Sequence, residues 1–134
     1  MASPRFQPIP DELNALSKVV LDCAFKVHKA LGPGLLETTY RLCLCHELKK
    51  AGLRVQSEVE LPVKYDGVIL ESGYRIDVIV NEEIVLELKA CEGLLAIHQA
   101  QLLSYLKHSG KRLGLLINFN SILLKEGIRR VING

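Results

Sequence analysis

Two short runs of mostly aliphatic residues near the middle of the chain, residues 74–80 and 84–90, each contain one acidic residue. The first run contains Asp77 and the second contains Glu87. Runs this apolar are typical of strands in the centre of a sheet, where charged side chains are rare without a partner. Any fold of this chain must therefore place the two carboxylates where their charge is compensated.

The residues between the two runs predict how the strands pair. Residues 81–83 form a three-residue loop in this interpretation, so that Val80 faces Ile84 in an antiparallel pair. Asp77 then lies opposite Glu87, with the Cβ atoms about 5 Å apart. Two like charges at this separation destabilise a sheet unless a cation neutralises them, and a hard divalent cation with oxygen ligands would do so. The alternative is a solvated edge hairpin, which the surrounding aliphatic residues disfavour.

Lys89 follows Glu87 by two residues and shares its face of the strand. The same register puts Arg75 of the first strand opposite Lys89. An ammonium group beside a bound cation can hold a water or a phosphate oxygen and stabilise developing negative charge. The hairpin therefore predicts a metal site suited to cleaving phosphodiester bonds.

The remaining pattern predicts an α/β (α+β) fold with a mixed central sheet of about four to five strands flanked by helices. Helices are expected over residues 11–31, 36–51, 94–108 and 122–132, and strands over residues 54–60, 68–70, 74–80, 84–90 and 113–119. Asp11 is expected to cap the first helix and Ser121 the last. Residues 1–10 are expected to form an extended arm, and residues 11–134 one domain.

Bulk composition excludes several classes of protein. The chain has 134 residues, 49% hydrophobic and 24% charged, which is globular, and its net charge of +2 is too small to indicate nucleic acid by itself. Its four cysteines lack Cys-x-x-Cys spacing, so they predict no zinc site and are expected to be small buried side chains in a reducing cytosol. No signal peptide or membrane-spanning run occurs, so we expect a cytoplasmic protein with no membrane partner.

Two weaker signals lie on the helices. Glu37 and Tyr40 are three residues apart and are expected to share a helix face, although a glutamate in the first turn is explained equally well by the helix dipole. Gln101 and Tyr105 form a polar stripe that would lie over the carboxylate face, although each alone fits an ordinary half-exposed position. His98 is expected at the surface or as a helix cap.

Five motifs occur in order along the chain: Gly34-x-x-Glu37-x-x-Tyr40, Gly73-Tyr74-Arg75-Ile76-Asp77, Glu87-Leu88-Lys89-Ala90, Ala100-Gln101-Leu102-Leu103-x-Tyr105-Leu106 and the run from Gly114 to Phe119. This series resembles the GxxExxY family of small bacterial and archaeal proteins, which is placed in the PD-(D/E)XK nuclease superfamily. The resemblance spans about residues 13–131 and implies a restriction-endonuclease-like core, with a four-stranded mixed sheet between helices. Ile76 stands where the superfamily motif has proline, a departure that many members share.

The resemblance also implies roles for individual residues. Asp77 and Glu87 would bind Mg²⁺ or Mn²⁺, with the Leu88 carbonyl as another possible ligand. Glu37 would complete the site directly or through water. Lys89 would assist the attacking water.

Gln101 and Tyr105 match the Gln-x-x-x-Tyr element of the exonuclease-like branch of the superfamily. They would position the nucleophile or the scissile phosphate.

Two functions follow as expectations. The first is a magnesium-dependent nuclease, a hydrolase acting on DNA rather than RNA. The second is a catalytically silent module that keeps the fold and serves interaction or nucleic-acid binding. So short a chain has little room for a separate DNA-recognition element, so a homodimer would be needed to enclose a duplex.

Overall fold

The computed structural model describes residues 7–134. The helices are α1 (Asp11–Leu31), α2 (Glu37–Lys50) and α3 (Ala96–Ser109), with a 3₁₀ turn η1 (Leu124–Gly127). The strands are β1 (Val55–Glu60), β2 (Val63–Tyr65), β3 (Val68–Leu70), β4 (Arg75–Val80), β5 (Ile84–Lys89), β6 (Leu113–Asn118) and β7 (Ile128–Ile132). Of the predicted N-terminal arm, residues 1–6 lie outside the described residues, and residues 7–10 belong to no helix or strand.

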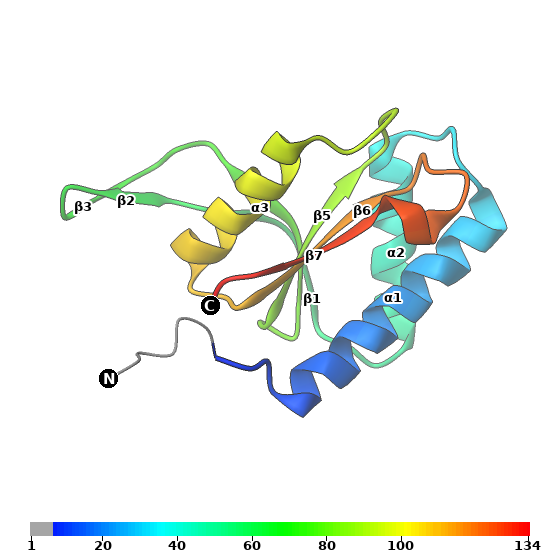
Figure 1. Ribbon diagram of the computed structural model, residues 1–134, viewed down its shortest axis with the longest axis horizontal. Coiled ribbons are helices and arrows are strands. Elements are labelled where there is room, and N and C mark those ends of the chain that lie inside the picture. The colour runs from blue at the N-terminus through cyan, green and yellow to red at the C-terminus, as the bar shows by residue number, and fades with distance from the viewer. Residues whose placement is uncertain (1–6) are drawn as a thin grey trace.

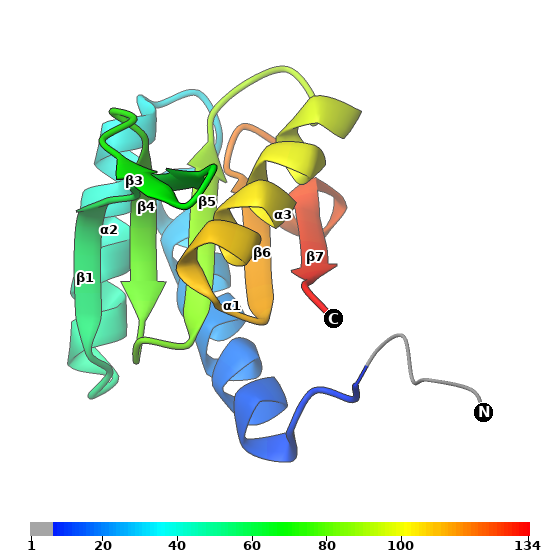
Figure 2. The same ribbon diagram turned by 90° about the vertical axis from the view of Figure 1, so that its left-hand side faces the viewer.

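Five strands form one mixed sheet in the order β1-β4-β5-β6-β7. The β5–β6 pair is parallel, and the other three pairs are antiparallel. Helices α1 and α2 cover one face of the sheet and α3 covers the other, which confirms the predicted fold class (Figure 1). Strands β2 and β3 form a separate hairpin that projects from the sheet on the side of α3 (Figure 2).

Two hydrophobic clusters hold these layers together, one on each face of the sheet. The larger lies between the sheet and helices α1 and α2, and includes Val20, Leu44 and Leu86. The smaller lies beneath α3, where Leu102 and Leu106 pack against Val85. Because helices cover both faces, β5 and β6 are buried along almost their whole lengths, as their aliphatic sequences require.

Most elements agree with the sequence-based expectations, but the start of α1 differs. Its N-cap is Pro10 and not Asp11. The Pro10 carbonyl accepts hydrogen bonds from the amides of Leu13 and Asn14, and Asp11 lies one residue inside, where its charge favours the helix dipole. A turn at Asp66-Gly67 joins β2 to β3, with φ of 54° and 73°, the left-handed pair that a two-residue hairpin turn needs.

The predicted helix over residues 122–132 is wrong. The segment forms η1 followed by β7, which pairs antiparallel with β6. Its β-branched residues Ile128, Val131 and Ile132 favour a strand, and the pairing supplies β6 with backbone partners on its second edge.

A close approach at Gly127 fixes the turn into β7. A Cβ atom there would lie 2.1 Å from Ser121 Oγ and 2.7 Å from the Asn118 carbonyl oxygen. Ser121 therefore packs against this turn and does not cap a helix.

The structure also shows the state of the cysteines and whether any described helix could cross a membrane. All four cysteines are free thiols; Cys23 and Cys45 are buried, whereas Cys43 and Cys91 are only half-buried. Within residues 7–134, no helix combines the length and apolar content needed to cross a bilayer.

Candidate functional site

The β4–β5 hairpin has the predicted register. Val80 pairs with Ile84, and the ladder continues through Val78 and Leu86. The next opposed positions in this register are those of Asp77 and Glu87. The start of β4 and the end of β5 therefore bring the two carboxylates to one end of the sheet.

At Asp77 the two strands stop exchanging backbone hydrogen bonds. The Leu88 amide donates to Asp77 Oδ2 at 2.8 Å, and the Asp77 amide donates to Glu87 Oε1 at 3.5 Å. Side-chain oxygens thus occupy the place of backbone partners, and the strands end their ladder at Val78 and Leu86. The hairpin is open where the acids lie.

The predicted opposition of Arg75 and Lys89 is wrong for the same reason. The β4–β5 ladder ends at Val78 and Leu86, so Arg75 has no paired residue in β5. Along its other edge β4 pairs with β1, where Arg75 lies opposite Glu60. Lys89 remains next to the site at the end of β5, where it is half-buried. Lys89 therefore lies next to the candidate site without Arg75 opposite it.

An irregularity in β1 lies across from Asp77. Glu58 has a positive φ of 53°, and the β1–β4 register skips this position between its neighbours. Beyond it, Ile76 packs in the cluster beneath α3, while Val78 packs in the cluster beneath α1 and α2. Ile76 and Val78 are two residues apart and would share a face of a regular strand, so the alternation of faces in β4 is broken at Asp77.

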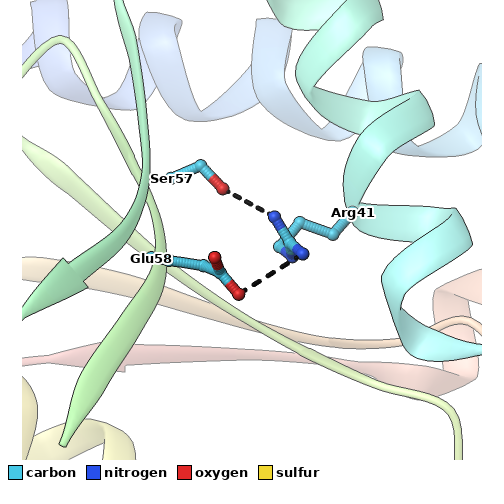
Figure 3. A network of polar contacts seen from close by, with 3 residues as sticks. All are labelled: Arg41, Ser57 and Glu58. Carbon is cyan, nitrogen blue, oxygen red and sulfur yellow. Dashed lines mark hydrogen bonds and ion pairs between the residues drawn. The ribbon is translucent and has the colours of Figure 1, made fainter.

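Arg41 of α2 holds this irregular part of β1 (Figure 3). Its Nη1 donates to Ser57 Oγ at 2.8 Å, and its Nη2 lies 3.4 Å from Glu58 Oε1. The Arg41 side chain is 17% exposed, so the guanidinium is well shielded from water. The contact ties the helix that begins at Glu37 to the strand beside Asp77.

Burial and like charge act together on Glu87. The residue is 5% exposed, and within residues 7–134 neither Glu87 nor Asp77 makes an ion pair. Burial, followed by the negative charge of Asp77, raises the pKa of Glu87 to about 9, against the opposing effect of the Lys89 ammonium. The metal-free pair therefore holds a proton at neutral pH. A divalent cation would replace that proton, because it satisfies both carboxylates at once.

Glu37 lies at the first position of α2, and its side chain is exposed. Removal from water and the charge of Asp77 raise the pKa of Glu37, whereas Lys89 and Arg41 lower it. The Glu37 side chain is therefore within electrostatic reach of Asp77. Within the described chain, however, no group of three or more Asp, Glu, His or Cys side chains is close enough to hold a metal ion. The geometry thus favours a water-mediated contribution from Glu37 over direct ligation.

Tyr40 explains how the start of α2 is held in place. Its side chain is fully buried and stacks on Phe119, with ring centroids 4.7 Å apart. Its hydroxyl donates to the Gly32 carbonyl and accepts a hydrogen bond from the Leu35 amide at 3.1 Å. Tyr40 therefore fixes the loop before Glu37, a positioning role that sequence reasoning missed when it placed both residues on one helix face.

Tyr105 lies on the opposite side of the sheet, and it is 8% exposed. Burial and the charge of Glu87, with smaller contributions from Tyr74 and Asp77, raise the pKa of Tyr105 to about 12. The tyrosine is thus within electrostatic reach of both carboxylates. Gln101, one turn earlier in α3, is half-buried and lines a cavity together with Tyr105.

His98 takes the second of its two expected roles. Its Nδ1 accepts a hydrogen bond from the Leu95 amide at 3.0 Å, which caps the start of α3. It is therefore a helix cap and not part of the candidate site.

Comparison with known families gives one result that covers most of the chain. A family model described as the PD-(D/E)XK nuclease superfamily matches residues 14–131. Comparison with curated proteins and with solved structures gives no match.

Proposed function

This chain belongs to the PD-(D/E)XK nuclease superfamily, and we propose that it is a divalent-metal-dependent nuclease that hydrolyses phosphodiester bonds, with DNA as its substrate. The observation that carries the proposal is the Asp77–Glu87 pair at the open end of the β4–β5 hairpin. Two carboxylates with no ion-pair partner in residues 7–134 form an anionic site, and a cation is the partner that fits it.

Asp77 and Glu87 would hold the ion, with the Leu88 carbonyl as a third ligand. The Lys89 carbonyl accepts from the Phe119 amide on the β6 side, so the preceding residue directs its N–H and C=O toward β4. There the Leu88 amide already donates to Asp77. The same residue can thus orient the Asp77 carboxylate with its N–H and offer its C=O to the ion.

The other residues would act on water and phosphate. A bound Mg²⁺ or Mn²⁺ would supply Lewis-acid stabilisation of the phosphoryl oxygens and a water that is easier to deprotonate. Lys89 would stabilise the negative charge that develops on the phosphate. Glu37 would orient water at the start of α2, and Gln101 and Tyr105 would position the nucleophile or the scissile phosphate.

Within the superfamily, we assign the chain to the GxxExxY group. The structural role of Tyr40 supports the assignment, because it gives the Gly-x-x-Glu-x-x-Tyr spacing a physical reason: the tyrosine hydroxyl holds the loop that presents the glutamate. In this proposal the Gly-x-x-Glu-x-x-Tyr spacing serves to position Glu37, and Tyr40 is not itself a ligand of the metal ion.

The experiment is a cleavage assay on labelled single-stranded DNA, duplex DNA and RNA of one sequence, with Mg²⁺, Mn²⁺ or EDTA. We expect cleavage of DNA by the wild type with either metal and none with EDTA. Lys89→Ala and Glu87→Gln should each lose at least about 100-fold in rate, because the first removes the cation that stabilises the developing negative charge and the second removes a ligand of the metal ion. Metal-independent cleavage, or full activity of either variant, would contradict the proposal.

One observation favours the catalytically silent alternative: within residues 7–134, no third acidic, His or Cys side chain joins the carboxylate pair. Thermal unfolding with and without Mg²⁺ tests for metal binding, since an ion held by the native state must raise the melting temperature. Together with the cleavage assay, it separates the two functions. Stabilisation without cleavage of any substrate would favour the silent module. Measurement of the solution mass in the same samples tests the homodimer, which stays a prediction.

A further inference from the structure

A groove is lined by residues of β2, of the segment before β4 and of α3. Its volume is about 330 Å³, within the range of about 300–1,000 Å³ in which proteins hold small organic groups. Side chains from three elements or their ends line it, including Val63, Tyr74, Ile97, Gln101, Tyr105 and His108. Two of these residues, Gln101 and Tyr105, are also predicted site residues, so the groove and the candidate site share part of α3.

An aromatic ring stands at the wall of this groove. Tyr74 immediately precedes β4 and is 51% exposed, and its ring centroid lies 6.0 Å from that of the buried Tyr105, at 52°. The backbone of Tyr74 is fixed on both sides, because its carbonyl accepts from the Leu61 amide and its amide donates to Ser72 Oγ. The ring is therefore supported from behind and has free surface for a further planar group.

The lining of the groove is nearly without charge. The residues that line it include no acidic side chain and no Lys or Arg, and His108 is the one imidazole among them. Aliphatic surface from Val63 and Ile97 is combined with the amide of Gln101, which can both donate and accept hydrogen bonds. Such a surface suits a neutral planar heterocycle with a polar edge, whereas a phosphate would find no cation in it.

We propose that this groove binds an unpaired nucleobase of a single-stranded nucleic acid, stacked on Tyr74, next to the phosphate that the site cleaves. The inference rests on the proposed nuclease function and narrows its substrate. Tyr105 lines the groove within electrostatic reach of Glu87 and Asp77, and Tyr74 immediately precedes β4, the strand that carries Asp77, so a base in the groove places its adjoining phosphate toward the carboxylate pair. A base within an intact duplex is already stacked on both faces, so it is unavailable to this ring.

The test uses a short single-stranded DNA with one 2-aminopurine, whose fluorescence is quenched when the base stacks on an aromatic ring. It is run in EDTA, so that binding is measured without cleavage. Wild type and Tyr74→Phe should quench the probe and bind with similar affinity. Tyr74→Ala should bind about ten- to hundredfold more weakly and abolish the quenching, since stacking on a protein aromatic contributes that much per base.

Two further variants complete the experiment. Tyr65→Ala is the matched control, because Tyr65 is a tyrosine that is 71% exposed on the β2–β3 hairpin and does not line the groove; it should behave as the wild type. Ile97→Glu should weaken binding at least about tenfold, because it puts a carboxylate into the groove at an exposed helix position. Addition of the protein to duplex DNA of the same sequence, in which the probe is already stacked between its neighbours, should cause no further quenching.

The outcomes also separate this inference from the proposed function. If the oligonucleotide is cleaved with Mg²⁺ but Tyr74→Ala leaves quenching and affinity unchanged, base binding in the groove is rejected and the proposed nuclease activity is kept. Quenching that depends on Tyr74, without any cleavage, overturns the nuclease and leaves a single-strand binding site. The inference is also rejected if the wild type neither binds the oligonucleotide nor quenches the probe, or if a second copy of the chain is found to cover the groove.

Discussion

Asp77 of β4 accepts a hydrogen bond from the backbone amide of Leu88 of β5, and the two atoms are 2.8 Å apart. A side-chain carboxylate thus replaces a backbone carbonyl as the partner of an amide in the middle of the sheet. Under the proposed function, the same residue would have two separable roles, one in strand pairing and one in binding a cation. Substitutions can be chosen that remove either role alone.

Asp77→Asn keeps an oxygen that can accept from the Leu88 amide, whereas Asp77→Ala does not. We expect Asp77→Asn to change the free energy of unfolding by less than about 1 kcal/mol, and Asp77→Ala to lower it by about 1–3 kcal/mol through the unpaired amide. Both should lose metal-dependent cleavage. Urea unfolding in EDTA, alongside the cleavage assay, checks this. Equal stability losses in the two variants would show that the hydrogen bond contributes little.

The raised pKa of Glu87 predicts how the stability of the metal-free protein depends on pH. The native state holds a proton on Glu87 that the unfolded chain releases near the ordinary value of 4.5. Between that pH and about 9 the native state binds more protons, so this group makes stability fall as pH rises; below 4.5 it contributes no pH dependence.

Glu87→Gln removes the titration and is the matched comparison. In EDTA, the variant should gain stability relative to the wild type as pH increases from 5 to 9, and Mg²⁺ should reverse the order by stabilising only the wild type. Urea unfolding at three pH values measures both effects. Parallel curves for the two proteins in EDTA would mean that Glu87 ionises normally.

Tyr40→Phe tests the positioning of Glu37. The variant keeps the stack on Phe119 but loses the hydroxyl that contacts Gly32 and Leu35. We expect a loss of about 1 kcal/mol in the free energy of unfolding and a fall in cleavage rate as large as that of Glu37→Gln. Combining Tyr40→Phe with Glu37→Gln should then cost no further rate, since both act through one group. Additive losses would assign Tyr40 to the core alone.

Gly127→Ala tests the turn that leads into β7. The new methyl group would meet Ser121 Oγ and the Asn118 carbonyl, so the variant should lose about 1–3 kcal/mol of stability. Gly93→Ala is the control, because a Cβ at Gly93 meets no atom within 4 Å. The melting temperatures of the two variants test this prediction. A normal melting temperature for Gly127→Ala together with a lowered one for Gly93→Ala would contradict the packing at Gly127.

The parts of the fold that could be predicted from sequence are those determined by neighbouring residues. The register of β4 and β5 follows from a short loop and a local pattern, and it is correct from Val80 to Val78. The start of η1 and β7 could not be predicted in this way, because residues 122–132 have a pattern compatible with a helix, and only the free edge of β6 makes a strand the better solution.

The same distinction applies within the candidate site. The opposition of Asp77 and Glu87 is a local property of the hairpin and was predictable. The side that Ile76 faces depends on the irregularity at Glu58 in another strand, and the burial of Tyr40 depends on Phe119 far along the chain. Both are set by tertiary contacts, for which single-strand or single-helix periodicity carries no signal.

The tight loop between β4 and β5 has a consequence for the order in which the molecule assembles. Asp77 and Glu87 are ten positions apart, so little loop-closure entropy opposes their meeting, whereas β5 and β6 must wait for the whole α3 crossover. The like-charge pair is therefore formed in one of the most local pairings of the sheet, and its repulsion opposes an early step of assembly. Metal ions or low pH, by relieving that repulsion, should speed refolding more than they slow unfolding.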